Sequence, residues 1–297
     1  MRRNILLEKG IFMESGFQKA LKQAVKYPVL LIVSGVVALF CLIAFIMQAL
    51  NLFSVFGWFA DMLIWRLGDI GSLFDNLGDI FGNGLYLISY FFYTLQFLGT
   101  IALIGLLFGF VTGILKHSKK MDITLVIVAV AASYIIGPLY ELFSGLPLFS
   151  GPVWFFYRLH NILPMNLAAL VTVVFLLLSV YKKKTLRFSL YLYIAGGIQL
   201  LFAVFHIVGS LMIGSVQFIS VLTWMINLIS PILFVFMGCM VEEQLTGEKV
   251  PYVGKLIDAV NSVRFEAPAA ASAPAVQTPA PQEKSDASAE EKTDSTL

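Results

Sequence analysis

The stretch Pro28–Leu50, PVLLIVSGVVALFCLIAFIMQAL, contains no charged residue. As an α-helix it would be about 35 Å long, enough to cross the roughly 30 Å hydrocarbon core of a bilayer. Arginine and lysine dominate the residues before it, and the first charge after it is Asp61. Because basic residues stay on the cytoplasmic side, this helix is expected to enter the membrane from that side.

The composition of the whole chain agrees with a membrane protein. Of its 297 residues, 59% are hydrophobic and only 13% are charged, more apolar surface than a soluble domain can bury. The net charge of +2 gives no reason to expect a nucleic-acid partner, so the expected surroundings are a lipid bilayer. Basic inner loops and short turns favour a multi-pass protein of a bacterial cytoplasmic membrane.

The apolar segments predict an all-α bundle of six transmembrane helices over residues 28–241, with both termini cytoplasmic. The run between Arg187 and Glu242 holds no charge and would be about 80 Å long as one helix, so it must be a hairpin that turns near Gly209–Gln217. The expected spans are residues 28–50, 88–115, 123–143, 162–181, 188–208 and 217–240.

Four segments flank or interrupt the spans. Residues 1–27 and 242–265 are expected to be amphipathic and cytoplasmic, and residues 266–297, rich in Ala, Pro and Ser, to be a disordered tail. Residues 51–87 carry an apolar stripe at helical spacing together with aspartates and several glycines. We expect them to form broken interfacial helices on the external side.

Three glycines on the second span predict a helix-packing face. Gly105, Gly109 and Gly113 recur at intervals of four residues, which places them on one side of a helix. Without side chains there, a neighbouring helix could approach closely.

Two amides are expected to reach the middle of the membrane. Gln199 and Asn227 lie equally far from the centre of the predicted hairpin turn, so they share a depth. Each is the other's nearest candidate partner, which favours a hydrogen-bonded structural pair over a substrate site.

Two proline breaks suggest a relationship between the halves of the chain. Gly137 and Pro138 interrupt the third span, and Pro231 interrupts the sixth at a similar depth. An inverted repeat of three plus three spans would produce this pattern, and such breaks often line binding sites, although single prolines are common in membrane helices.

No catalytic, metal-binding or cofactor-binding motif is present in the sequence. Glu141, Arg158, His160 and His206 are polar candidates at the outer face. They fit an interfacial salt bridge and a hydrogen-bonded histidine better than an acid–base pair or a proton relay.

Three classes of function remain open from the sequence. A small transporter or channel-like permease is the leading interpretation, because of the proline breaks and the midplane amides. The alternative is a structural or accessory subunit that packs with a second copy or a partner membrane subunit. An intramembrane enzyme comes third, since no catalytic set can be assembled, and the chain is therefore expected not to be an enzyme.

Overall fold

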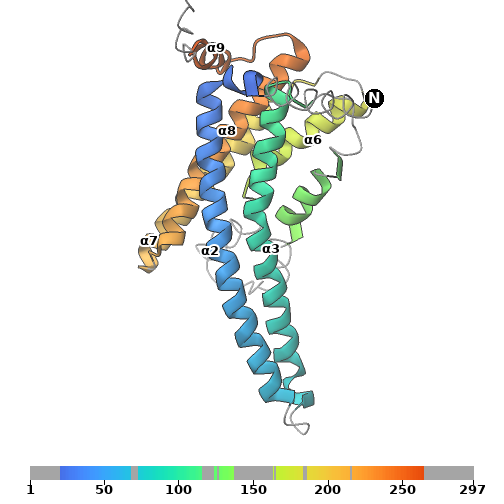
Figure 1. Cartoon of the computed structure of the whole chain (residues 1–297), viewed down its shortest axis with the longest axis vertical. Coiled ribbons are helices and arrows are strands. Elements are labelled where there is room, and N and C mark those ends of the chain that lie inside the picture. The colour runs from blue at the N-terminus through green and yellow to red at the C-terminus, as the bar shows by residue number, and fades with distance from the viewer. Residues whose placement is uncertain are drawn as a thin grey trace, which may run out of the picture. The chain divides into compact units, whose positions relative to one another are not determined.

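The computed structural model describes residues 21–67, 73–115, 124–125, 127–136, 163, 165–182, 186–214 and 216–263, and this part of the chain forms helices and no strand. The labelled helices in Figure 1 are α2 (Pro28–Leu67), α3 (Leu73–Val111), α6 (Leu167–Lys182), α7 (Ser189–Ile213), α8 (Phe218–Thr246) and α9 (Gly254–Ser262). A further short helix, which carries no label, covers Ile127–Ile136.

Four of these helices, α2, α3, α7 and α8, are long and apolar enough to cross a membrane. They fall on the first, second, fifth and sixth predicted spans, which supports the prediction of an all-helical membrane protein. The predicted third and fourth spans correspond to Ile127–Ile136 and to α6, which are shorter apolar helices. The count of six, the orientation of the termini and the inverted repeat stay predictions.

Helix α8 is the element around which the others pack. It contacts α2, α3, α6 and α7, and it also touches α9. Because it has neighbours on several sides, large residues such as Phe234 and Met237 are completely buried. Any polar residue on the inner surface of α8 is therefore placed at the centre of the packed helices.

Helices α2 and α3 pack side by side, and both are longer than a membrane crossing requires (Figure 1). The 40 residues of α2 span about 60 Å. The expectation of breaks in the helices of residues 51–87 is wrong for residues 51–67 and 73–87, which belong to the continuous helices α2 and α3, and their interfacial position stays a prediction. Contacts between the two helices explain the continuity: Asn83 Nδ2 donates to Met62 Sδ at 3.3 Å, and Tyr90 hydroxyl donates to Gln48 Oε1.

Glycine determines where three of the long helices end. Gly113, Gly214 and Gly247 follow α3, α7 and α8 with φ values of 71°, 73° and 70°, a left-handed conformation that glycine adopts without steric strain. Gly214 lies inside the turn predicted at residues 209–217, and α7 and α8 pack against each other as a hairpin.

The predicted amphipathic segment at residues 242–265 consists of two parts. Residues up to Thr246 belong to α8, and α9 then packs on α2 and α8 with Ile257 buried and Leu256 exposed. The predictions for residues 1–20 and 266–297 lie outside the described residues.

Candidate functional site

A buried asparagine joins four parts of the molecule. Asn166 lies directly before α6 and is fully buried. Its Nδ2 donates to Thr100 Oγ1 at 2.9 Å and to the Tyr134 hydroxyl at 2.8 Å, and its Oδ1 accepts from Ser230 Oγ at 2.8 Å. These partners come from α3, the short helix Ile127–Ile136 and α8. Asn166 thus uses both amide donors and one of the two acceptor positions of its carbonyl oxygen.

A small cavity lies beside the start of α6, between α7 and α8. Its free volume is about 10 Å³, enough for about one water molecule. The residues that line it are Leu163, Met165, Leu167, Ile198, Gln199, Phe202, Ala203 and Asn227. The cavity therefore combines apolar walls with two side-chain amides.

Gln199 completes the first turn of α6. Its Oε1 accepts a hydrogen bond from the backbone N–H of Ala168 at 3.3 Å. The first N–H groups of a helix have no partner within the helix, so an acceptor from a neighbouring helix satisfies one of them. Gln199 is buried on α7, and this contact ties α7 to the start of α6.

Asn227 is one of several buried side chains with a polar atom that has no hydrogen-bond partner among the described residues, and it is the one that lines the cavity. Its side chain is 4% exposed, and neither Oδ1 nor Nδ2 has a hydrogen-bond partner among the described residues. Pro231 follows four residues later and has no N–H, so the Asn227 carbonyl does not receive the usual helical hydrogen bond. The side-chain amide and the backbone carbonyl of Asn227 therefore both lack their usual hydrogen-bond partners.

The structure brings the predicted pair Gln199 and Asn227 to the same cavity, as their equal distance from the turn indicates. The predicted hydrogen bond between them is not formed, since both amide atoms of Asn227 lack a partner in the described part of the chain. The side-chain carbonyl of Gln199 is instead directed at the start of α6, where it accepts from the Ala168 N–H.

The predicted helix breaks and outer-face polar residues do not gather at one site among the described residues. Pro231 lies inside α8, next to Ser230 of the Asn166 network. His206 is half-buried on α7. The remaining candidates, Gly137, Pro138, Glu141, Arg158 and His160, lie outside the described residues.

The predicted glycine face does not form a close helix contact with any described residue. A Cβ at Gly105 would meet no atom within 4 Å, and Gly113 already lies beyond the end of α3. A Cβ at Gly109 would lie 2.5 Å from Leu115 Cδ1, because the chain folds back under the helix end. Close helix packing occurs instead at Gly238, where a Cβ would lie 2.6 Å from Leu192 Cδ1 and 2.8 Å from Thr172 Oγ1.

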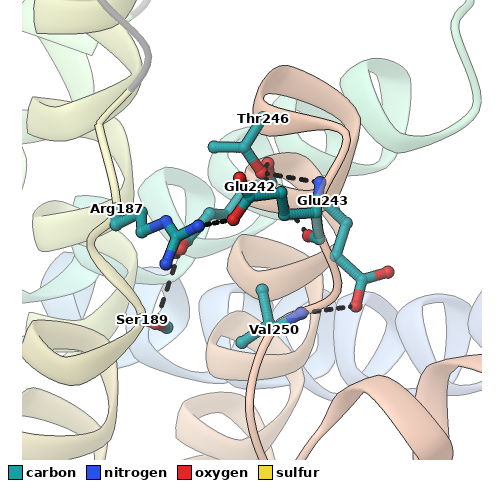
Figure 2. Close-up of polar contacts among 7 residues, drawn as sticks. Arg187, Ser189, Glu242, Glu243, Thr246 and Val250 are labelled. Carbon is teal, nitrogen blue, oxygen red and sulfur yellow. Dashed lines mark hydrogen bonds and ion pairs between the residues drawn. The ribbon is translucent and has the colours of Figure 1, made fainter.

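A second polar cluster lies around Glu242, near the C-terminal end of α8. Glu242 is 3% exposed; its Oε2 accepts from the backbone N–H of Phe188 at 3.0 Å, and its Oε1 from Ser189 Oγ at 3.5 Å. Figure 2 shows this carboxylate directed at the start of α7. A negative charge at a helix N-terminus is favourable, so Glu242 of α8 acts as the cap of α7.

The residues around Glu242 connect further elements. Gln244 Nε2 donates to the Val111 carbonyl at the end of α3, at 2.7 Å, and the Glu243 carboxylate accepts from the Val250 N–H at 3.0 Å (Figure 2). Arg187 and Glu248 form an exposed ion pair. The cluster therefore fixes α3, α7, α8 and the segment before α9 to one another.

An exposed ion pair adds to this end of the molecule. Lys249 Nζ contacts Asp258 on α9, and this hydrogen bond and negative charge raise the pKa of the Lys249 amino group above its ordinary value.

Sequence reasoning missed Asn166, its three partners and Glu242. Each is a single polar residue in or beside an apolar segment, and such a residue is a recognisable signal. What the sequence does not show is that residues from four segments meet.

In the described part of the chain no cluster of three or more His, Cys, Asp or Glu side chains could hold a metal ion. Comparison of the chain with protein-family models, curated proteins and solved structures finds no match.

Proposed function

We propose that this protein is a small transporter or channel-like permease for polar solutes. The observation that supports this function best is the Asn227 amide, which is 4% exposed, lines a cavity and has no hydrogen-bond partner among the described residues. Leaving a buried amide unsatisfied costs about 1–3 kcal/mol, so a group of this kind needs an explanation. A solute that binds transiently at Asn227 supplies one.

The surroundings of Asn227 also support transport. Discontinuous helices form the binding sites of many transporters, because their free backbone groups contact the substrate. Here Pro231 interrupts the hydrogen bonding of α8 at Asn227, and α6 begins at the same cavity. The neighbouring Asn166 network holds these two interruptions at fixed positions.

Flux through purified protein in lipid vesicles tests this proposal. We expect vesicles that contain the full chain to take up at least one class of small polar solute faster than protein-free vesicles. Asn227→Leu should reduce the difference about tenfold, the effect of losing about one hydrogen bond, whereas Met225→Leu, on the exposed side of the same helix, should retain it. Equal fluxes with and without the protein for water, ions and neutral solutes would refute a transport function.

The alternative function, a structural or accessory subunit, is supported by a different observation. Helix α2 is about 30 Å longer than a bilayer crossing requires, and exposed aromatic residues continue along the extra length, with Phe53 76% and Trp65 85% exposed. Phe53 also lines an apolar groove of about 410 Å³ between α2 and α3, which is formed by Leu52, Phe53, Phe56, Leu87, Ile88 and Phe91. Exposed apolar surface of this kind marks interaction sites.

The size of the purified complex distinguishes this alternative. If the groove binds a second copy, the protein should elute as a dimer in detergent, and Phe53→Ser with Phe56→Ser should convert it to a monomer. A monomer before and after the substitutions would exclude self-association through this groove.

We also propose that the protein lies in a bacterial cytoplasmic membrane, because of the charge distribution of its loops. We assign no enzymatic activity to it.

A further inference from the structure

The ligand class at the Asn227 cavity follows from which polar groups face it, and this inference rests on the transport function proposed above. The residues that line the cavity are six apolar residues and two neutral amides, Gln199 and Asn227. An ion moved from water into such a cavity would lose its hydration without gaining an opposite charge, at a large free-energy cost. The lining therefore selects against charged ligands.

Asn227 determines which hydrogen bonds a neutral ligand has to make. Its Nδ2 is a donor and its Oδ1 an acceptor, and both lack partners within the described residues. A ligand with only acceptors, such as an ether or ketone, would leave Oδ1 unsatisfied. A hydroxyl or an amide group, which both donates and accepts, can satisfy both atoms together.

The start of α6 orients such a ligand. The helix has 16 residues and ends at Lys182, so Leu167 lies about 24 Å from the end that carries the charge. This length is less than the roughly 30 Å hydrocarbon thickness, which puts the start of α6 inside the membrane. The Ala168 N–H is already bonded to Gln199, but the positive end of the α6 dipole favours the electronegative atom of a neutral ligand in the cavity.

We infer that the Asn227 cavity binds small neutral solutes that carry both a donor and an acceptor, with hydroxyl or amide groups. Water is the smallest member of this class and the only one for which the free volume of about 10 Å³ has room. Larger members, such as urea or glycerol, need more room than this volume provides, so their binding requires that α7, which carries part of the lining, shift away from α6 and α8. Ala203, fully enclosed on α7, is the small residue on this wall of the cavity.

Solute selectivity of the full chain in lipid vesicles tests this inference. The rate of vesicle swelling reports water, urea and glycerol entry, and ion-selective electrodes report potassium, chloride and formate. We expect the neutral solutes to cross and the ions to be excluded. Asn227→Leu removes both hydrogen-bonding atoms and should lower urea and glycerol entry about tenfold, the effect of losing about one hydrogen bond. Ala203→Val fills the cavity while leaving the Asn227 amide in the chain, and it should have the same effect.

Met225→Leu is the matched control, since Met225 is exposed on α8 and does not line the cavity. Passage of ions at rates similar to those of urea would overturn the ligand class while leaving transport intact. Neutral flux that persists in both Asn227→Leu and Ala203→Val would show that the path lies elsewhere. If no solute crosses faster than in protein-free vesicles, the transport function fails and this inference fails with it.

Discussion

Two buried asparagines differ in how many hydrogen bonds the fold provides for them. Asn166 makes three hydrogen bonds, whereas Asn227 makes none with the described residues. A buried polar group stabilises a protein only when it has partners. The first residue is therefore expected to hold the structure together, and the second to be retained for a ligand.

The same substitution at the two asparagines should give opposite results. Asn166→Leu deprives Ser230 of its partner and should lower the free energy of unfolding by about 1–3 kcal/mol. Asn227→Leu removes two unsatisfied atoms and should be neutral or stabilising. Thermal unfolding in detergent micelles measures both variants. A larger loss for Asn227→Leu than for Asn166→Leu would show that Asn227 has structural partners.

Glycines on α7 and α8 provide a second comparison between single residues. Gly238→Ala places a Cβ within 2.8 Å of both Thr172 and Leu192 and should destabilise the protein by about 1–3 kcal/mol. Gly197→Ala meets no atom within 4 Å and should stabilise it by up to about 1 kcal/mol, because alanine favours the helix. Thermal unfolding of the pair gives the difference, and equal midpoints would contradict the tight packing at Gly238.

At the scale of the elements, the end of α8 controls the start of α7. Glu242→Ala leaves the buried N–H of Phe188 without an acceptor and should cost about 1–3 kcal/mol, whereas Glu242→Gln keeps one acceptor oxygen and should cost less. Glu248→Ala removes only an exposed ion pair with Arg187 and should change stability by less than about 1 kcal/mol. Amide hydrogen exchange should rise at the first turn of α7 only in the Glu242 variants. A similar rise in Glu248→Ala would contradict the capping role of Glu242.

The continuity of α2 beyond the expected membrane boundary is also testable. Residues 51–65 are helical and pack along α3, so we expect their amide hydrogens to exchange as slowly as those of residues 35–49 in the same helix. In the connection between α8 and α9, the exposed residues Lys249 and Tyr252 serve as the rapidly exchanging reference. Exchange in residues 51–65 as fast as in this connection would support the broken helices expected from the sequence.

At the scale of the whole molecule, the far end of α2 and the region of α9 should lie on opposite sides of the membrane. Trp65 is 85% exposed, Lys255 is exposed, and the native Cys41 and Cys239 are buried, which keeps background labelling low. A membrane-impermeant thiol reagent added to cells should modify Trp65→Cys, and Lys255→Cys only after permeabilisation, because basic residues favour the inside. The reversed pattern would invert the orientation, and labelling of both from one side would show that α2 does not cross.

The sequence by itself determined the helical membrane class, because long charge-free runs are stable only as helices in a bilayer. It also indicated the position of the α7–α8 turn and the shared depth of Gln199 and Asn227, both of which depend on distances along a single hairpin. Helix length was harder to predict. The extent of α2 depends on its contacts with α3, such as Asn83 with Met62, and local propensity does not contain them.

Only the tertiary structure decided which polar groups have partners. Gln199 and Asn227 share a cavity, yet the Gln199 carbonyl accepts from Ala168 because α6 begins beside it. The Asn166 network joins residues of four segments, namely Asn166, Thr100, Tyr134 and Ser230. The spacing of residues within one segment does not predict contacts between different segments. Hydrogen bonds need groups within about 3 Å in three dimensions, and helix packing sets those distances.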